Sequence, residues 1–213
     1  MNRKINAVLT AAVILGGLAP SRAAVVFSDN FDSEHGGTAD VFNYTGFANF
    51  AISDGTVDLI GTGGLYDFFP GNGLYVDLDG SSLDAGKMTS VSIPVAPGNY
   101  ALSFQLAGSQ RGDVNTVQVN VDTGFASQSY ILNSGAPLAT HILNFAVGAP
   151  TSINLVFENT SGPGDFAGAI LDNIVLESAE PPSSEAPDGG STAGLLALGS
   201  IALGVIRRRS TRA

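Results

Sequence analysis

Apolar residues recur at every second position through most of residues 24–176. In residues 100–107, for example, four large apolar side chains alternate with small or polar ones. Successive side chains of a β-strand point to opposite faces, so this spacing predicts strands with one buried face. No stretch sustains the 3.6-residue apolar stripe of an amphipathic helix. The pattern therefore restricts this part of the chain to an all-β fold.

The same alternation around Val119, Phe145 and Phe157 predicts further strands. Short strands separated by glycine and proline are typical of a sandwich of two sheets. About ten such strands predict a single jelly-roll-like β-sandwich, which we place at residues 24–179. The sequence contains no cysteine, so burial of the core and not disulfide bonding must stabilise this domain.

Both ends of the chain carry targeting features. Residues 1–23 combine a basic start, an apolar segment and a small-x-small cleavage site, which predicts a signal peptide. Residues 180–186 form a linker rich in proline and serine. Residues 187–213 begin with a turn of small residues, continue as an apolar run over residues 193–206 and end in an arginine cluster.

The apolar run is short for a membrane span. As an α-helix its 14 residues would extend about 21 Å, less than the roughly 30 Å of a bilayer core. We therefore expect a short transmembrane helix that anchors weakly. By the positive-inside rule the arginines stay in the cytoplasm, which places the domain before residue 187 outside it.

The order of these parts resembles the C-terminal sorting signal of the PEP-CTERM class, in its Val-Pro-Asp-Ser-Gly variety. Ala186 and Gly189 depart from that pattern. Members of the class are sorted by exosortases. The resemblance implies Sec export, cleavage by signal peptidase, transient inner-membrane anchoring and processing by an exosortase-like enzyme. The product would lie at the cell surface, in the outer envelope or in the medium. An ordinary tail anchor is the alternative. The residues of the predicted sorting motif are Pro187, Asp188, Gly189, Gly190, Ser191, Thr192, Arg207, Arg208 and Arg209.

The charge of the predicted domain and linker is strongly negative. Residues 24–186 hold two basic and eighteen acidic residues, a formal net charge of −16. Such a chain repels phosphates, which excludes nucleic-acid binding. The two basic residues are Lys87 and Arg111, and we interpret Arg111-Gly112-Asp113 as a turn.

We expect no enzymatic activity. The two histidines, His35 and His141, are accompanied by neither a Gly-x-Ser-x-Gly elbow nor a His-Glu-x-x-His motif. Paired carboxylates can hydrolyse glycosides, but a chain with this many acids offers many accidental pairs.

Four segments carry a second resemblance, namely residues 27–32, 67–80, 106–111 and 170–174. They look like exosortase-sorted proteins with a galactose-binding-like β-sandwich, an architecture shared with many carbohydrate-binding modules. The resemblance implies weak binding of a glycan or exopolysaccharide. Two alternatives remain. One is a purely structural component of a surface layer or biofilm matrix, and the more distant one is a polysaccharide-modifying enzyme.

The same resemblance implies a structural calcium ion. In such sandwiches calcium often joins the first strand to the last, and Asp32 and Asp172 match those positions. Calcium takes six to eight oxygen ligands, so backbone carbonyls near Asp29 and Asn30 would have to complete the shell. The alternative is that Asp32 and Asp172 are solvated or capping residues.

A second acidic pair follows an alternating segment. If Leu74, Val76 and Leu78 face the core, Asp77 and Asp79 emerge on the outer face of their sheet. We expect both carboxylates to be solvated there.

One loop combines aromatic rings with turn residues. Residues 65–73 contain three aromatic rings and two glycines. Sugar sites use a ring face against the apolar side of a pyranose and a few polar groups for its hydroxyls. We therefore expect Tyr66, Asp67 and Asn72 to bind the ligand. The alternative is that Phe68 and Phe69 plug one end of the sandwich.

Overall fold

A computed structural model describes residues 23–82, 84–122, 124–161 and 165–178 of the protein. The predicted linker, the predicted sorting signal and residues 1–22 of the predicted signal peptide lie outside this part. No helix within the described ranges is long and apolar enough to cross a membrane. The predicted transmembrane helix falls in the segment that is not described.

The described ranges contain thirteen β-strands and one short 3-10 helix. In chain order they are β1 (Ala24–Asp29), η1 (Glu34–Gly37), β2 (Phe50–Ser53), β3 (Asp58–Gly61), β4 (Leu74–Asp77), β5 (Lys87–Ser90), β6 (Ile93–Val95), β7 (Gly98–Ala107), β8 (Val114–Val121), β9 (Ala126–Asn133), β10 (Ala139–Val147), β11 (Thr151–Ile153), β12 (Leu155–Asn159) and β13 (Ile170–Ser178).

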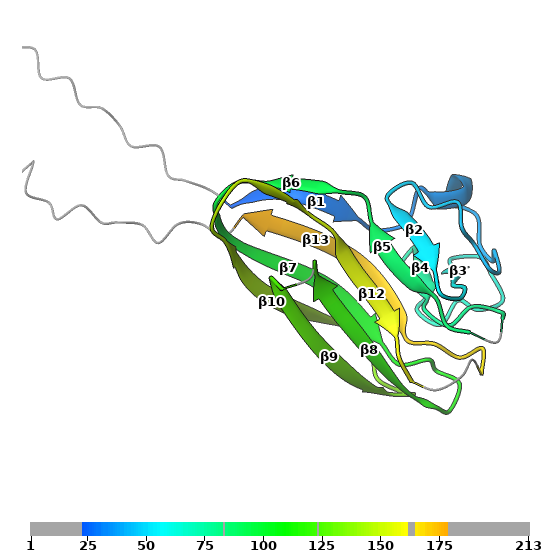
Figure 1. Ribbon diagram of the computed structural model, residues 1–213. Coiled ribbons are helices and arrows are strands. Elements are labelled where there is room, and N and C mark those ends of the chain that lie inside the picture. Colours follow the sequence, from blue (N-terminus) through cyan, green and yellow to red (C-terminus); the bar gives the residue numbers. More distant parts are fainter. Residues whose placement is uncertain (1–22, 83, 123, 162–164, 179–213) are drawn as a thin grey trace, which may run out of the picture.

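The strands form two main antiparallel sheets packed face to face (Figure 1). One sheet has the order β10-β7-β13-β4-β3, and β1 pairs with the C-terminal half of β13. The other has the order β2-β5-β12-β8-β9, and β6 pairs with β11 separately. This arrangement confirms the predicted all-β, jelly-roll-like sandwich.

The core between the sheets is built from the faces that the alternation predicts to be buried. In β7, Leu102, Phe104 and Leu106 are fully buried. Phe104 packs edge-on against Phe157 of β12, with 5.4 Å between the ring centroids. Burying a side chain of this size stabilises a fold by about 1.5–3 kcal/mol. Contacts of this kind hold the two sheets together.

The outer face of the first sheet is covered as well. A second buried cluster lies there, on β3, β4, β7 and β13, and side chains from neighbouring loops pack onto it. Its members are Ile60, Tyr75, Ala107 and Ile170, with Phe68, Phe69 and Leu138 packed against them. Phe68 and Phe69 thus cover a sheet face and do not plug an end of the sandwich.

This cover corrects one expectation. Asp77 and Asp79 were predicted to be solvated, but they are 1% and 2% exposed. The alternation places the Asp77 side chain opposite Val76, as expected. The error arises because chain segments that are distant in sequence lie over this part of the sheet and exclude water from it.

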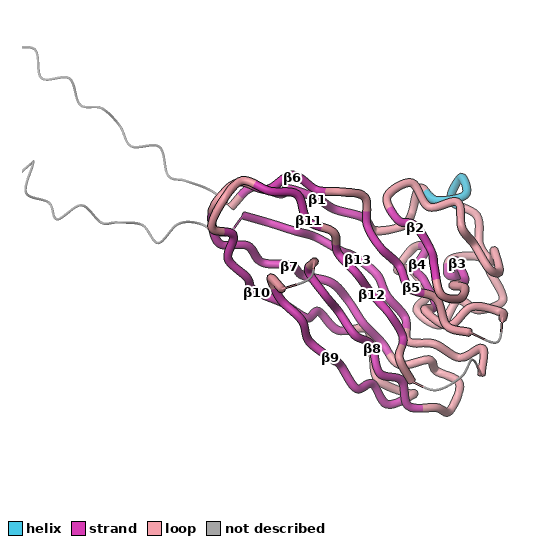
Figure 2. Tube along the Cα trace, viewed as in Figure 1, coloured by secondary structure: helices cyan, strands magenta, loops and turns pink. Residues whose placement is uncertain are grey.

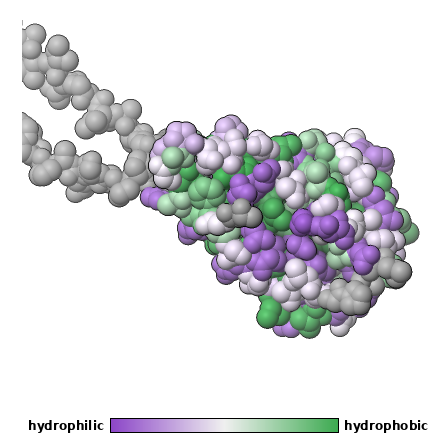
Figure 3. Space-filling view, in the orientation of Figure 1, coloured by the Kyte–Doolittle hydropathy of each residue, from purple (hydrophilic) through white to green (hydrophobic). Residues whose placement is uncertain are grey.

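The two ends of the sandwich differ. The first and last strands meet at one end, where the backbone nitrogen of Ala24 lies 3.1 Å from the Ser178 hydroxyl. Strands β3 and β4 lie at the other end, surrounded by most of the long loops (Figure 2). Hydrophilic and apolar residues are intermixed over the face drawn in Figure 3. The loop-rich end is therefore the place to look for a site.

Candidate functional site

A buried ion pair lies beneath the loop-rich end. Asp77, the last residue of β4, pairs with the Arg111 guanidinium. The other carboxylate oxygen accepts hydrogen bonds from the backbone N–H groups of Asp79, at 3.0 Å, and Gly168, at 2.9 Å. Burial raises the pKa of the Asp77 carboxyl, and the charge of Arg111 is the main influence that lowers it. Asp77 and Arg111 thus hold each other in fixed positions. Of the two, Arg111 is accessible to solvent, because its side chain is 25% exposed.

Gly168 belongs to this arrangement because of its size. A Cβ at this position would lie 2.2 Å from the Asp79 nitrogen and 2.4 Å from Asp77 Oδ1. Only glycine lets the backbone before β13 approach Asp77 closely enough to donate its hydrogen bond.

The loop between β7 and β8 positions Arg111. Gln110 Nε2 is within 2.9–3.0 Å of the carbonyl oxygens of Gly108, Ser134 and Ala136, which ties this loop to the β9–β10 connection. The guanidinium carbon lies 5.7 Å from the ring centroid of Phe68 and 6.0 Å from that of Tyr66. These distances are within the range of cation–π attraction. The segment Arg111-Gly112-Asp113, predicted as a simple turn, therefore places the Arg111 guanidinium beside the aromatic loop of residues 65–73.

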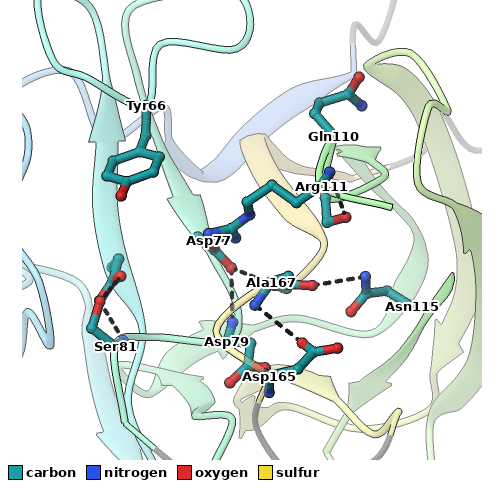
Figure 4. A network of polar contacts seen from close by, with 12 residues as sticks. Tyr66, Asp77, Asp79, Ser81, Gln110, Arg111, Asn115, Asp165 and Ala167 are labelled. Carbon is teal, nitrogen blue, oxygen red and sulfur yellow. Dashed lines mark hydrogen bonds and ion pairs between the residues drawn. The ribbon is translucent and has the colours of Figure 1, made fainter. Parts of the chain in front are cut away.

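A pocket of about 190 Å³ opens above the ion pair. Figure 4 shows Tyr66 and Ser81 on one side, Arg111 on the other and Asp77 between them. The three aromatic residues that line the pocket are partly exposed: Phe42 at 48%, Tyr66 at 36% and Phe166 at 46%. The residues that line the pocket are Phe42, Asp58, Ile60, Tyr66, Asp77, Ser81, Arg111 and Phe166.

Asp58 forms another wall of this pocket and is held rigidly. Its Oδ1 accepts hydrogen bonds from the backbone N–H groups of Asn43, at 2.7 Å, and Ser81, at 3.0 Å. Its Oδ2 accepts one from the Ser81 hydroxyl at 2.8 Å. The pocket thus combines exposed ring faces with charged groups whose positions are set by other contacts.

Tyr75 anchors the loop that carries Tyr66. Its ring is fully buried and packs edge-on against Phe69, with 5.8 Å between the centroids. The Tyr75 hydroxyl accepts a hydrogen bond from the Phe69 N–H at 3.1 Å. It can donate its own proton to the Tyr66 carbonyl or to Asp67 Oδ1, each of which lies 3.2 Å away. Burial raises the pKa of Tyr75 to about 12, so the hydroxyl keeps the proton that it donates.

The structure separates the three residues predicted to bind the ligand. Tyr66 lines the pocket. Asp67 instead lies against the Tyr75 hydroxyl. Asn72 donates a hydrogen bond from its side-chain amide to Asp172, on the other side of the loop.

Asp32 and Asp172, predicted to hold calcium, lie on either side of the segment that leads into β4. Asp32 Oδ1 accepts a hydrogen bond from the Leu74 N–H at 2.8 Å. Gly73, with φ +81°, allows this contact because a Cβ there would lie 1.9 Å from the same oxygen. Asp172 is fully buried. Burial and the charges of Asp32 and Asp29 raise its pKa to about 7.

The donor set at this place is incomplete for a metal ion. Across the described ranges, no three histidine or acidic side chains are grouped closely enough to hold one. A cation here would have two carboxylates and would need backbone carbonyls and water for the rest of its shell. Burial contributes most to the raised pKa of Asp172, and a cation would relieve the smaller contribution from the charges of Asp32 and Asp29.

Sequence reasoning missed most of the pocket. Arg111 offered a signal, because it is one of only two basic residues among eighteen acids in residues 24–186. A lone cation in so acidic a domain is expected to have a specific partner. No sequence signal pointed to Phe42 and Phe166, since these residues come from loops more than 100 residues apart.

Comparison with known proteins identifies a shared fold. No protein-family model matches the chain, and no curated protein matches it. Among solved structures, it is similar to the K3 cleaved adhesin domain of Lys-gingipain (Kgp) from Porphyromonas gingivalis W83. The TM-score is 0.52 at 14% identity, over 74% of this chain and 100% of that one. The likeness shows the fold.

A second solved structure with a similar outline is the CBM22-1 xylan-binding domain from Paenibacillus barcinonensis Xyn10C. The TM-score is 0.49 at 10% identity, over 76% of this chain and 99% of that one. The described β-sandwich therefore corresponds in extent to the whole K3 adhesin domain, which it covers completely.

Proposed function

We propose that this protein is an exported, non-enzymatic module that binds a glycan weakly through the pocket lined by Tyr66, Asp77 and Arg111. The observation that supports this most is the set of exposed aromatic rings around a fixed ion pair. A ring face packs against the apolar side of a pyranose, and guanidinium, carboxylate and hydroxyl groups bond its hydroxyls. The fold shared with an adhesin domain supports a binding role over a catalytic one.

Replacing Tyr66 by alanine is expected to weaken retention on the producer's own exopolysaccharide by at least about tenfold, since exposed tyrosines at a binding site often contribute more than 1 kcal/mol. Stability should fall less than on loss of the Phe68 ring, because Tyr66 is 36% exposed whereas Phe68 packs on the buried cluster around Tyr75. Affinity electrophoresis of the full chain measures retention. The matched control is Leu65→Ala, since Leu65 is 92% exposed and does not line the pocket.

Phe68→Ala provides the contrast in the same loop. Its ring packs on the cluster around Tyr75, so its removal should lower stability, and any binding defect should follow from that loss. Equal destabilisation by Tyr66→Ala and Phe68→Ala, with no selective effect on retention, would make this loop a cover for the sheet. The structural matrix component would then be the better account, supported by the formal net charge of −16 over residues 24–186, which suits cation bridging.

We further propose that calcium binds between Asp32 and Asp172 and ties the first strand to the last. Without calcium, Asp172 with its raised pKa holds a proton more tightly in the folded state than in the unfolded state. Stability should therefore fall as the pH rises from about 4 through about 7. Calcium should offset that loss by binding only the folded state.

Melting curves at pH 8, with calcium and with a chelator, test the calcium site. The melting temperature should be higher with calcium, and Asp172→Ala should abolish the difference. Asp84→Ala is the control, because this acid is exposed and distant in sequence from both proposed ligands. Identical curves with calcium and with chelator would leave Asp32 and Asp172 as structural acids only.

We also propose that residues 187–213 direct processing by an exosortase-like enzyme after Sec export, and that the product is retained at the surface or in the matrix. Changing Arg207, Arg208 and Arg209 together to serine is expected to impair maturation, because the cluster sets the orientation of the short predicted helix. Intact mass spectrometry of the protein recovered from cells reads both termini. Normal maturation of the triple variant would contradict the sorting proposal.

A further inference from the structure

We infer that the pocket above the Asp77–Arg111 ion pair accommodates a single neutral sugar ring, and that it selects against uronic acids and other anionic sugars. This inference rests on the proposed function and specifies the ligand class of the same site. Two features of the pocket carry it, namely its size and the balance of charge in its walls.

The pocket is small. Its volume of about 190 Å³ lies below the range of roughly 300–1,000 Å³ that is usual for sites of drug-sized ligands. It equals the space of about six liquid waters at roughly 30 Å³ each. One pyranose fits such a space, whereas a stretch of several linked sugars needs more.

The aromatic side chains are arranged around this small volume and do not extend along a track. Phe42 and Tyr66 meet edge to face, with 5.8 Å between their centroids and 79° between their planes. Tyr66 and Phe68 do the same at 6.1 Å and 63°. A site that reads a long chain presents successive rings at sugar spacing along a groove. Phe42 and Tyr66 meet at a steep angle, so at most one of these two rings offers its face to a given sugar.

The walls of the pocket disfavour negative charge. Asp58 and Asp77 contribute carboxylates, and Arg111 contributes one guanidinium, which already pairs with Asp77. The formal charge of these three groups is −1 when both acids are ionised and zero when Asp77, whose pKa burial raises to about 8, holds a proton. In neither state do the walls carry a net positive charge. A uronate brought next to Arg111 would compete with a buried carboxylate that has a fixed geometry, and it would face Asp58 as well. Like charges placed this close repel.

Neutral hydroxyl groups match the same walls. A guanidinium has five N–H donors in a planar fork, and pairing with a single oxygen of Asp77 leaves others able to donate. Asp58 Oδ2, which accepts one bond from Ser81, keeps acceptor capacity for a sugar O–H. Donors and acceptors on opposite walls suit a hydroxyl-bearing ring, since each hydroxyl can both donate and accept.

Isothermal titration of the purified full chain tests the ligand class. The probes are the methyl glycosides of xylose, glucose, galactose and mannose, and those of glucuronic and galacturonic acid, in low salt with chelator. At least one neutral glycoside should bind at least about tenfold more tightly than its acidic counterpart. Asp58→Asn should reduce the ratio of neutral to acidic glycoside affinity, because it removes a carboxylate that repels the uronate.

Chain length tests the size of the site. For the neutral sugar that binds, the mono-, tri- and hexasaccharide should differ in affinity by less than about threefold. Tighter binding of a uronide, or an affinity that rises tenfold or more with length, would overturn the inference while leaving glycan binding intact. If neither the sugars nor the producer's exopolysaccharide bind, the proposed function itself fails and the inference falls with it.

Discussion

Replacing Arg111 by methionine is expected to lower the free energy of unfolding by about 3–5 kcal/mol, because it leaves the buried Asp77 carboxylate without its cation. The Asp77 side chain is only 2% exposed, so water cannot replace the lost partner. Methionine retains most of the length of the arginine side chain, which limits the loss of packing against Tyr66 and Phe68. Urea denaturation at pH 9, above the pKa of about 8 that Asp77 has in the parent, measures the effect.

The loss should be smaller at acidic pH. Burial raises the folded-state pKa of Asp77 above its unfolded value, and removing Arg111 removes the main influence that opposes this shift. The folded variant therefore binds more protons than the unfolded chain from about pH 4 up to its folded-state pKa, and its stability falls over that range. With Arg111 in place the pKa of Asp77 is about 8, so at pH 5.5 the carboxyl is neutral in both proteins, and the deficit should lack the contribution of the lost charge pairing.

A double-mutant cycle provides the control. Asp77→Asn alone leaves Arg111 partly solvated, which costs less than a buried unpaired carboxylate. The double variant Arg111→Met, Asp77→Asn should be more stable than Arg111→Met alone. Additive losses in the cycle, with the same deficit at both pH values, would show that Arg111 stabilises the fold through packing and not through charge.

Replacing Tyr75 by alanine is expected to have an effect of similar size, about 3–5 kcal/mol, because it removes a fully buried ring and leaves a cavity. Its ring contacts Phe69, and its hydroxyl accepts a hydrogen bond from the Phe69 N–H and lies within hydrogen-bonding distance of the Tyr66 carbonyl. The β3–β4 loop should then lose its attachment to the sheet. Denaturation measures the stability, and amide exchange of Phe68 and Phe69 reports on the loop.

Tyr75→Phe separates packing from hydrogen bonding. It keeps the ring and removes only the hydroxyl, so it should cost about 1–3 kcal/mol. Glycan affinity should fall in this variant as well, because the hydroxyl helps to position the loop that carries Tyr66. A fully stable Tyr75→Phe variant with unchanged loop exchange would mean that the ring alone anchors the loop.

Fold class was predictable from local information. The period-two pattern decided which side chains of residues 100–107 face the core, and those side chains are buried. It could do so because a strand's side chains alternate whatever the strand packs against. The same rule placed Asp77 on the face opposite Val76, and this direction was right. The predicted solvation of Asp77 was wrong, because alternation says nothing about whether another segment covers that face.

The pocket depended on contacts between distant parts of the chain. Asp77 meets Arg111 across 34 residues and Gly168 across 91, and Asn72 reaches Asp172 across 100. Sequence spacing carries no record of such pairings, since they follow from the order of strands in the sheets. The sequence by itself determined that this domain is an acidic, cysteine-free β-sandwich with an aromatic loop. Only the tertiary structure decided that the loop lies over the sheet and that one arginine and three aromatic rings enclose a pocket there, because hydrogen bonds and burial across the fold position those groups.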